Sequence, residues 1–147
     1  MSNVMILACS HSVLATSNVT AITRFFAMAF DVAPVFENEA FAEFVLPSRF
    51  RVAFFVPTGT AAKVFDAAAP RSAGALGLTV RDVDVMFARL ESMRASFAFI
   101  LSGPPRDHPW GERSFLLTDP DGNRWEIAQA PSDDGMLVPI SVTPPTP

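Results

Sequence analysis

The sequence carries one pattern twice, and this internal repeat constrains the fold more than any other feature. Apolar residues recur at three- and four-residue spacing over Val19–Phe30, which predicts an amphipathic helix that ends before Pro34. The same spacing predicts a second helix over Asp82–Met93, about 64 residues further along. One strand-like run precedes each helix and three follow it. We therefore expect two copies of a strand–helix–three-strand unit that cover each other's apolar faces.

Short runs of β-branched and aromatic residues, interrupted by Asn, Pro and Gly, predict the strands. In the first copy these runs are Val4–Ala15, Val35–Glu37, Phe41–Leu46 and Phe50–Val56. In the second copy they are Gly74–Val80, Phe97–Leu101, Arg113–Leu117 and Arg124–Ala128. The proline-containing stretch Ser102–Gly111 is predicted to be a loop.

The chain of 147 residues is expected to form one structural domain with two modules. The first module is expected over residues 1–57 and the second over 74–130, joined by a linker over 58–73 with a helical turn near Ala62–Ala68. The Pro-rich tail over 131–147 is expected to be a mobile arm or a strap on a neighbouring molecule.

Composition excludes several classes of function. The net charge is −4, so the chain offers no basic stripe to neutralise nucleic-acid phosphates. No run reaches the roughly 18 apolar residues of a membrane span, and no positive segment precedes Val4–Leu7 as in a signal peptide. The single cysteine, Cys9, excludes an internal disulfide. We therefore expect a soluble, cytoplasmic protein.

Two segments near the end of the second copy carry a family resemblance. Pro109–Phe115 leads into Thr118–Ile127, and the latter contains the turn Asp-Pro-Asp-Gly-Asn followed by Arg-Trp-Glu. In this context the chain resembles the vicinal oxygen chelate superfamily, which includes glyoxalase I, extradiol dioxygenases and bleomycin-resistance proteins. The resemblance implies an α+β fold of two βαβββ modules that form a cup-shaped half-barrel with the helices on its outer face. Within this superfamily, the sequence is most similar to the metal-free members that resemble bleomycin-resistance proteins.

Strand alternation after this turn places Glu126 on one face and Trp125 and Ile127 on the other. The resemblance implies that the strand face with Glu126 lines the interior of the cup. The opposite face, with Trp125 and Ile127, then meets a helix. A carboxylate in an apolar cup is costly unless it is paired or bound, so Glu126 is a candidate functional residue.

Metal-binding relatives hold their ion with a residue on the first and last strand of each module. His11 and Glu126 match two of these positions, whereas Ala75 and the strand Phe50–Val56 supply no ligand at the other two. Two ligands are fewer than a catalytic zinc or non-haem iron site needs. His108 lies in a proline-flanked loop, from which it could swing in or reach a partner chain. The alternative for His11 is a strand histidine bonded to a neighbour.

These observations favour a metal-independent protein that binds an amphipathic or aromatic small molecule in the cup, without a cofactor. The expected ligand-binding residues are His11, Phe54, Trp110, Arg113 and Glu126. Two alternatives remain open, so whether the chain is an enzyme is undecided. One is a lyase or dioxygenase with a divalent metal such as Zn, Ni, Fe or Mn on His11 and Glu126; the other is a metal-free enzyme that uses either residue as an acid–base group. We also expect a homodimer.

Overall fold

The computed structural model describes residues 4–71 and 73–131 and divides the chain into two compact units. Unit 1 is Met1–Ala69 and unit 2 is Pro70–Pro147, so the boundary falls inside the segment predicted as a linker. Apart from Pro131, the predicted tail lies outside the described residues.

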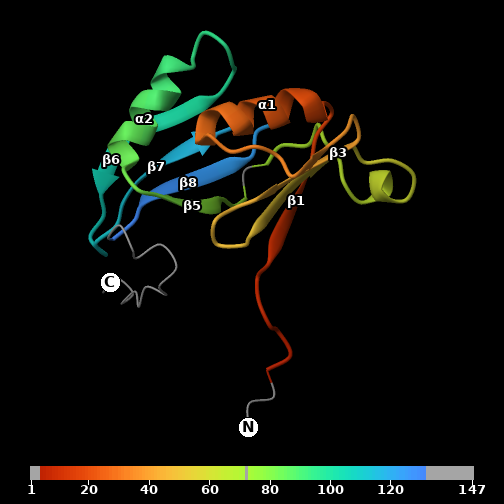
Figure 1. Ribbon diagram of the computed structural model, residues 1–147, viewed down its shortest axis with the longest axis horizontal. Helices are drawn as coiled ribbons and strands as arrows, with labels where there is room; N and C mark the ends of the chain where they lie inside the picture. The colour runs from red at the N-terminus through yellow and green to blue at the C-terminus, as the bar shows by residue number, and fades with distance from the viewer. Residues whose placement is uncertain (1–3, 72, 132–147) are drawn as a thin grey trace. The chain divides into compact units, whose positions relative to one another are not determined.

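Unit 1 is a four-stranded sheet, here called sheet A, with one helix against it (Figure 1). Its elements are β1 (His11–Ala15), α1 (Val19–Phe30), β2 (Phe36–Glu37), β3 (Phe41–Val45), β4 (Arg51–Phe55) and the short 3₁₀ helix η1 (Ala61–Lys63). The strand order is β1-β4-β3-β2, in which β1 runs parallel to β4 and the other pairs are antiparallel.

Local signals set the ends of α1, and apolar burial holds it on the sheet. The Asn18 side chain accepts a hydrogen bond from the Ala21 amide at 3.0 Å, and the helix ends at Asp31, which has a left-handed φ of 53°. Phe26 is buried, and its ring centroid lies 4.7 Å from that of Phe44 and 5.7 Å from that of Phe54. This aromatic cluster is the core of unit 1.

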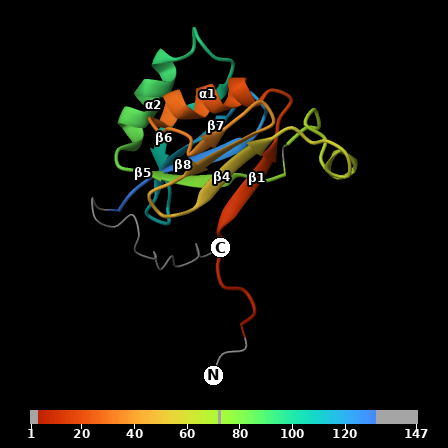
Figure 2. The ribbon, with the colours of Figure 1, turned by 45° about the vertical axis from the view of Figure 1, so that its right-hand side comes forward.

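Unit 2 repeats the arrangement with sheet B (Figure 2). Its elements are β5 (Leu76–Val80), α2 (Val83–Ser92), β6 (Ile100–Asp107), β7 (Arg113–Thr118) and β8 (Arg124–Gln129), in the order β5-β8-β7-β6. Asp82 caps α2 by accepting from two amides of its first turn. Buried α2 residues such as Met86 and Leu90 belong to the core of this unit with Trp125 and Ile127.

The side chains of each sheet therefore divide between a core face, which meets the helix, and the opposite face, here called the far face. In β8 the buried Trp125 and Ile127 alternate with the partly exposed Glu126. In β4 the buried Val52 and Phe54 alternate with the exposed Arg51. The far faces carry the polar groups that the helices leave uncovered.

The structure confirms the predicted α+β fold of two βαβββ modules and corrects two strand boundaries. The regular strand β1 begins only at His11, so Val4–Ser10 is not part of it. The predicted loop Ser102–Gly111 instead begins as strand β6, which continues through Pro104 and Pro105. Prolines are tolerated there because β6 is an edge strand and its pairing with β7 is irregular between Ser102 and Arg106. In the part of the chain described, no helix is both long and apolar enough to cross a membrane.

The Asp-Pro-Asp-Gly-Asn turn is held by the buried carboxylate of Asp119. Its oxygens accept four hydrogen bonds of 2.9 Å, from the backbone amides of Asp121 and Asn123 and from the side chains of Asn123 and Trp125. Arg71 donates to the Asn123 side chain at 2.6 Å. Gly122 takes a φ of 90°, which glycine adopts without strain. One side chain thus joins the turn to the core tryptophan.

We expect Asp119→Asn to destabilise the protein by about 2–3 kcal/mol, because an amide group would face donors where a carboxylate now accepts. Urea unfolding measures the change. The matched control is Asp66→Asn, whose carboxylate accepts one turn amide at 2.9 Å at an exposed site. A loss of stability no greater in Asp119→Asn than in the control would contradict this role.

Candidate functional site

The far face of sheet B brings together Glu126, Glu112, His108 and Ser114. Nε2 of His108 lies 2.8 Å from the Ser114 hydroxyl. The Glu112 carboxyl lies within hydrogen-bonding reach of Glu126. The sheet register places Glu126 between Gly77 on β5 and Leu116 on β7. Two carboxyls and an imidazole thus meet at the start of β7, beside the middle of β8.

The surroundings of Glu126 favour its protonated form. Burial is the largest cause that raises the pKa of this carboxyl, followed by the hydrogen bond and the negative charge of Glu112. The charge of His108 acts in the opposite direction. A bound cation would act in the same direction as His108 and favour the ionised form of Glu126.

Trp110 lies in the loop between β6 and β7, two residues before Glu112. The loop is closed by hydrogen bonds from the His108 amide to the Glu112 carbonyl at 2.7 Å and from the Gly111 amide to the His108 carbonyl at 3.0 Å. The indole stacks on the His108 ring, with centroids 4.5 Å apart and planes inclined by 9°. Trp110 is 44% exposed, so part of its surface stays open to solvent.

Arg113, which we expected beside Glu126, points elsewhere. Its guanidinium donates to both carboxylate oxygens of Asp84 on α2, at 2.8 and 3.1 Å, and lies 3.5 Å from Asp107. The hydrogen bond from Arg113 is the main cause that lowers the pKa of Asp84. Arg113 therefore ties the start of β7 to α2, on the helix side of sheet B and not beside Glu126.

The far face of sheet A carries His11, Arg51 and Glu43. His11 and Arg51 are direct partners in the register of β1 and β4, and Nη2 of Arg51 lies 3.4 Å from Nδ1 of His11. The Ser10 hydroxyl lies 2.8 Å from the same nitrogen. Nη1 of Arg51 lies 3.6 Å from the Glu43 carboxylate. His11 thus has neighbours of its own within unit 1, as the alternative interpretation expected.

Phe54, the remaining predicted ligand-binding residue, lies in the core of unit 1. Its side chain is fully buried between Phe26 and Phe44 on the α1 side of sheet A. The neighbours Ala53 and Phe55 occupy the far face instead. Phe54 thus packs in the core of unit 1, on the face opposite to His11.

The two modules differ at the position that Glu126 occupies. Counting back from the helix caps Asn18 and Asp82, Val13 corresponds to Gly77. Gly77 pairs with Glu126, whereas Val13 pairs with Ala53, so the counterpart of Glu126 in unit 1 is an alanine. Among the described residues of either unit, no three His, Cys, Asp or Glu side chains form a set that could hold a metal ion. These residues therefore do not fit a metal centre within one unit.

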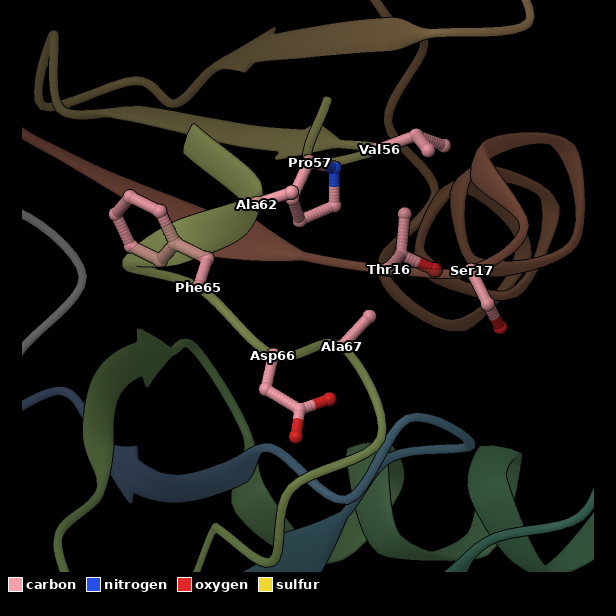
Figure 3. A pocket seen from close by; sticks show the side chains of 8 residues that line it. All are labelled: Thr16, Ser17, Val56, Pro57, Ala62, Phe65, Asp66 and Ala67. Atoms are coloured by element: carbon pink, nitrogen blue, oxygen red, sulfur yellow. The ribbon is translucent and has the colours of Figure 1, made fainter. Parts of the chain in front are cut away.

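Unit 1 also contains a pocket of about 410 Å³ where β1 gives way to α1 (Figure 3). It is lined by Thr16, Ser17, Val56, Pro57, Ala62, Phe65, Asp66 and Ala67. Two side-chain oxygens in this lining already accept hydrogen bonds from backbone amides. The Asp66 carboxylate accepts from the Ala68 amide at 2.9 Å, and the Thr16 hydroxyl accepts from the Asn18 amide at 3.1 Å. Because the Thr16 hydroxyl and the Asp66 carboxylate are already engaged, we place the candidate site at the Glu126 cluster instead.

Sequence reasoning proposed Glu126 and Trp110 but missed three of their neighbours. Glu112 and Ser114 lie inside the segment that carries the family resemblance, yet nothing local shows that they face Glu126. His108 was considered only as a metal ligand. Its place beside Ser114 follows from the pairing of β6 with β7, which joins Asp107 to Arg113.

Comparison with known proteins agrees with this architecture. A sequence model described as the Glyoxalase/Bleomycin resistance protein/Dioxygenase superfamily matches residues 8–127. A glyoxalase-related enzyme from Fulvimarina pelagi is similar in structure, with a TM-score of 0.71 and 26% identity, over 94% of this chain and 98% of that one. Among curated proteins, none matches the chain.

Two further solved structures share the fold. A superfamily member from Sphaerobacter thermophilus has a TM-score of 0.65 and 22% identity, over 86% of this chain and 99% of that one. A lactoylglutathione lyase from Agrobacterium tumefaciens has a TM-score of 0.63 and 20% identity, over 83% and 92%.

The raised pKa of Glu126 gives a stability prediction. The folded state holds this proton at a pH where the unfolded chain has already lost it, so the contribution of Glu126 to stability is present at low pH and lost as pH rises through the raised pKa. Glu126→Gln should therefore be more stable than the native protein at pH 7.5, by less than about 1 kcal/mol because solvent screens the group.

The matched control is Glu91→Gln, because the hydrogen bond from Arg94 lowers the pKa of Glu91. Its stability relative to the native protein should change with pH in the opposite sense. Chemical denaturation at pH 4 and pH 7.5 tests both variants. An equal stability difference between Glu126→Gln and the native protein at the two pH values would refute the argument.

Proposed function

The chain belongs to the glyoxalase/bleomycin resistance protein/dioxygenase superfamily, and we propose that it binds a small amphipathic or aromatic cation without a metal ion. The observation that carries the proposal is the carboxyl pair of Glu126 and Glu112, together with the exposed indole of Trp110, which stacks on the same His108 whose charge acts on Glu126. An aromatic cation would place its charge against the carboxyls and its ring against the indole.

The charges of unit 2 support a cationic ligand. Glu112 opposes the ionisation of Glu126, so a ligand cation beside the pair would relieve a repulsion that a single exposed carboxylate does not have. Arg113 does not compete for this place, because its guanidinium is bound to Asp84. His108 stacks on one face of the Trp110 indole and so restricts the rotamers of this side chain. A ligand that binds the other face therefore loses less free energy to ordering the indole.

The neighbours of His11 support the metal-independent form of the proposal. The guanidinium of Arg51 lies 3.4 Å from Nδ1 of His11, and a cation so close opposes the approach of a second cation. The counterpart of Glu126 in unit 1 is Ala53, which offers no ligand atom. No step of the proposed function passes through a metal.

Acid–base chemistry at Glu126 is a second candidate function. Its raised pKa favours it, because a carboxyl with a pKa nearer to neutrality exchanges a proton more readily under working conditions. An enzyme of this kind would convert its ligand at a rate that Glu126→Gln abolishes, whereas a binding protein would return the ligand unchanged.

Three variants test the binding proposal with N-methylacridinium, a planar aromatic cation, as the fluorescent probe. Trp110→Ala should weaken its binding by about 1–3 kcal/mol and leave stability nearly unchanged, because the indole is a partly exposed stacking partner. Glu126→Gln should weaken it by a similar amount. Trp125→Ala should instead lower stability by roughly 3–5 kcal/mol, because this indole is buried in the core.

The control ligand is acridine, which has the same ring system and is uncharged at pH 7.5. We expect it to bind the far face of sheet B much more weakly than the cation. Elemental analysis of the purified protein and dialysis against EDTA complete the experiment: cation binding should survive chelation. About one bound Zn, Ni, Fe or Mn per chain, or unchanged cation affinity in Trp110→Ala and Glu126→Gln, would overturn the proposal.

We also propose that the chain forms a homodimer, on the strength of the segment Val4–Ser10, here called the arm. The arm leaves the start of β1 and runs away from sheet A (Figure 1). Its four successive large apolar residues are exposed, with Ile6 at 78% and Leu7 at 97%. A contiguous apolar surface of this kind is typical of an interaction site, and two-fold dimers are the commonest soluble oligomers.

Replacing Ile6 and Leu7 by Asp should convert the dimer to a monomer, because each charge would have to be buried in the interface. Light scattering measures the mass against 15.9 kDa for one chain. The control is Val64→Asp, which changes a 75% exposed apolar residue outside the arm and should leave the mass unchanged. A native mass near that of one chain at micromolar concentration would exclude this dimer.

We place the protein in the cytoplasm as well. Cys9 is free and exposed in the structure, and an exposed thiol persists most readily in a reducing compartment.

A further inference from the structure

Arg51 is held more loosely than Arg94 and Arg113, each of which has a carboxylate oxygen 2.8 Å from its guanidinium. Nη1 lies 3.6 Å from Glu43, beyond hydrogen-bonding distance, and Nη2 lies 3.4 Å from Nδ1 of His11. That nitrogen has a closer neighbour, the Ser10 hydroxyl at 2.8 Å. The guanidinium is therefore near two acceptors but well bound by neither.

The guanidinium groups of Arg113 and Arg94 each form two hydrogen bonds to one carboxylate. Arg113 donates to both oxygens of Asp84 at 2.8 and 3.1 Å, and Arg94 donates to both oxygens of Glu91 at 2.8 and 3.2 Å. Such paired bonds are the geometry that the planar guanidinium prefers with a carboxylate. Arg51 has no such partner among the described residues, although its side chain is 45% exposed and within reach of a ligand.

Apolar side chains flank Arg51 on the same face. Val45 is its direct partner on β3, and Val13 lies two residues beyond His11 on β1; both are exposed. Phe36 is also exposed and pairs with Glu43 in the register of β2 and β3. A guanidinium surrounded by apolar side chains suits a ligand that has an anionic group at one end and an apolar body.

We propose that Arg51 is the anchor of a second ligand site, on the far face of sheet A, for a small aromatic or branched carboxylate. The guanidinium binds both carboxylate oxygens, and the apolar body of the ligand lies on Val13 and Val45. Glu43 acts as a weak internal competitor that the ligand carboxylate displaces. This site lies in unit 1 and uses no residue of the proposed cation site.

Benzoate tests the site, with neutral benzamide as the matched ligand. Calorimetric or NMR titration should show benzoate binding at least about tenfold more tightly than benzamide, because only the carboxylate pairs with the guanidinium. Arg51→Gln should weaken benzoate binding by about tenfold or more. Glu43→Gln should strengthen it by about threefold, because the competing carboxylate is removed.

Arg94→Gln is the control, since Arg94 is 49% exposed and already paired with Glu91. It should leave benzoate affinity within about twofold of the native value. If Arg51→Gln does not fold, Glu43→Gln decides alone: tighter binding supports the site, and equal or weaker binding overturns it. Equal affinity of the native protein for benzoate and benzamide also overturns it. N-methylacridinium titrated in parallel separates this outcome from failure of the cation site.

Discussion

The fold of unit 2 depends on the buried carboxylate of Asp119. By accepting four N–H groups it fixes the turn between β7 and β8 and so sets the register in which Leu116 faces Glu126. A slip of one residue would move Trp125 to the far face and Glu126 beneath α2, because side chains alternate along a strand. The interaction that secures the tryptophan in the core therefore also positions the acidic group.

The elements whose signals are local could be predicted from the sequence. The helix over Val19–Phe30 has the predicted bounds, because its apolar spacing and the Asn18 cap both lie within a few residues of the helix ends. Pairing between strands is not local, which is why the length of β6 was missed. Its two prolines indicate a loop when the sequence is considered alone, and only the edge position in sheet B lets the strand continue through them.

The difference between local signals and strand pairing also explains which residues of the candidate sites could be predicted. Alternation over a few residues was enough to predict that Glu126 and Trp125 lie on opposite faces. It could not show that Glu112 reaches Glu126, since that contact depends on how the loop after β6 closes. Nor could it assign Phe54 to the core face of β4, because the whole strand is apolar apart from Arg51. The pairing of Arg51 with His11 needed the parallel register of β1 and β4.

The prolines of β6 have a further consequence for how this protein behaves in a crowded solution. Pro104 and Pro105 have no backbone N–H, and Gly103 beside them takes a φ of 64°, so this stretch presents an interrupted row of donors at the outer edge of sheet B. Another chain cannot add a regular strand along it. The irregularity that disguises β6 in the sequence thereby protects this edge against templated aggregation.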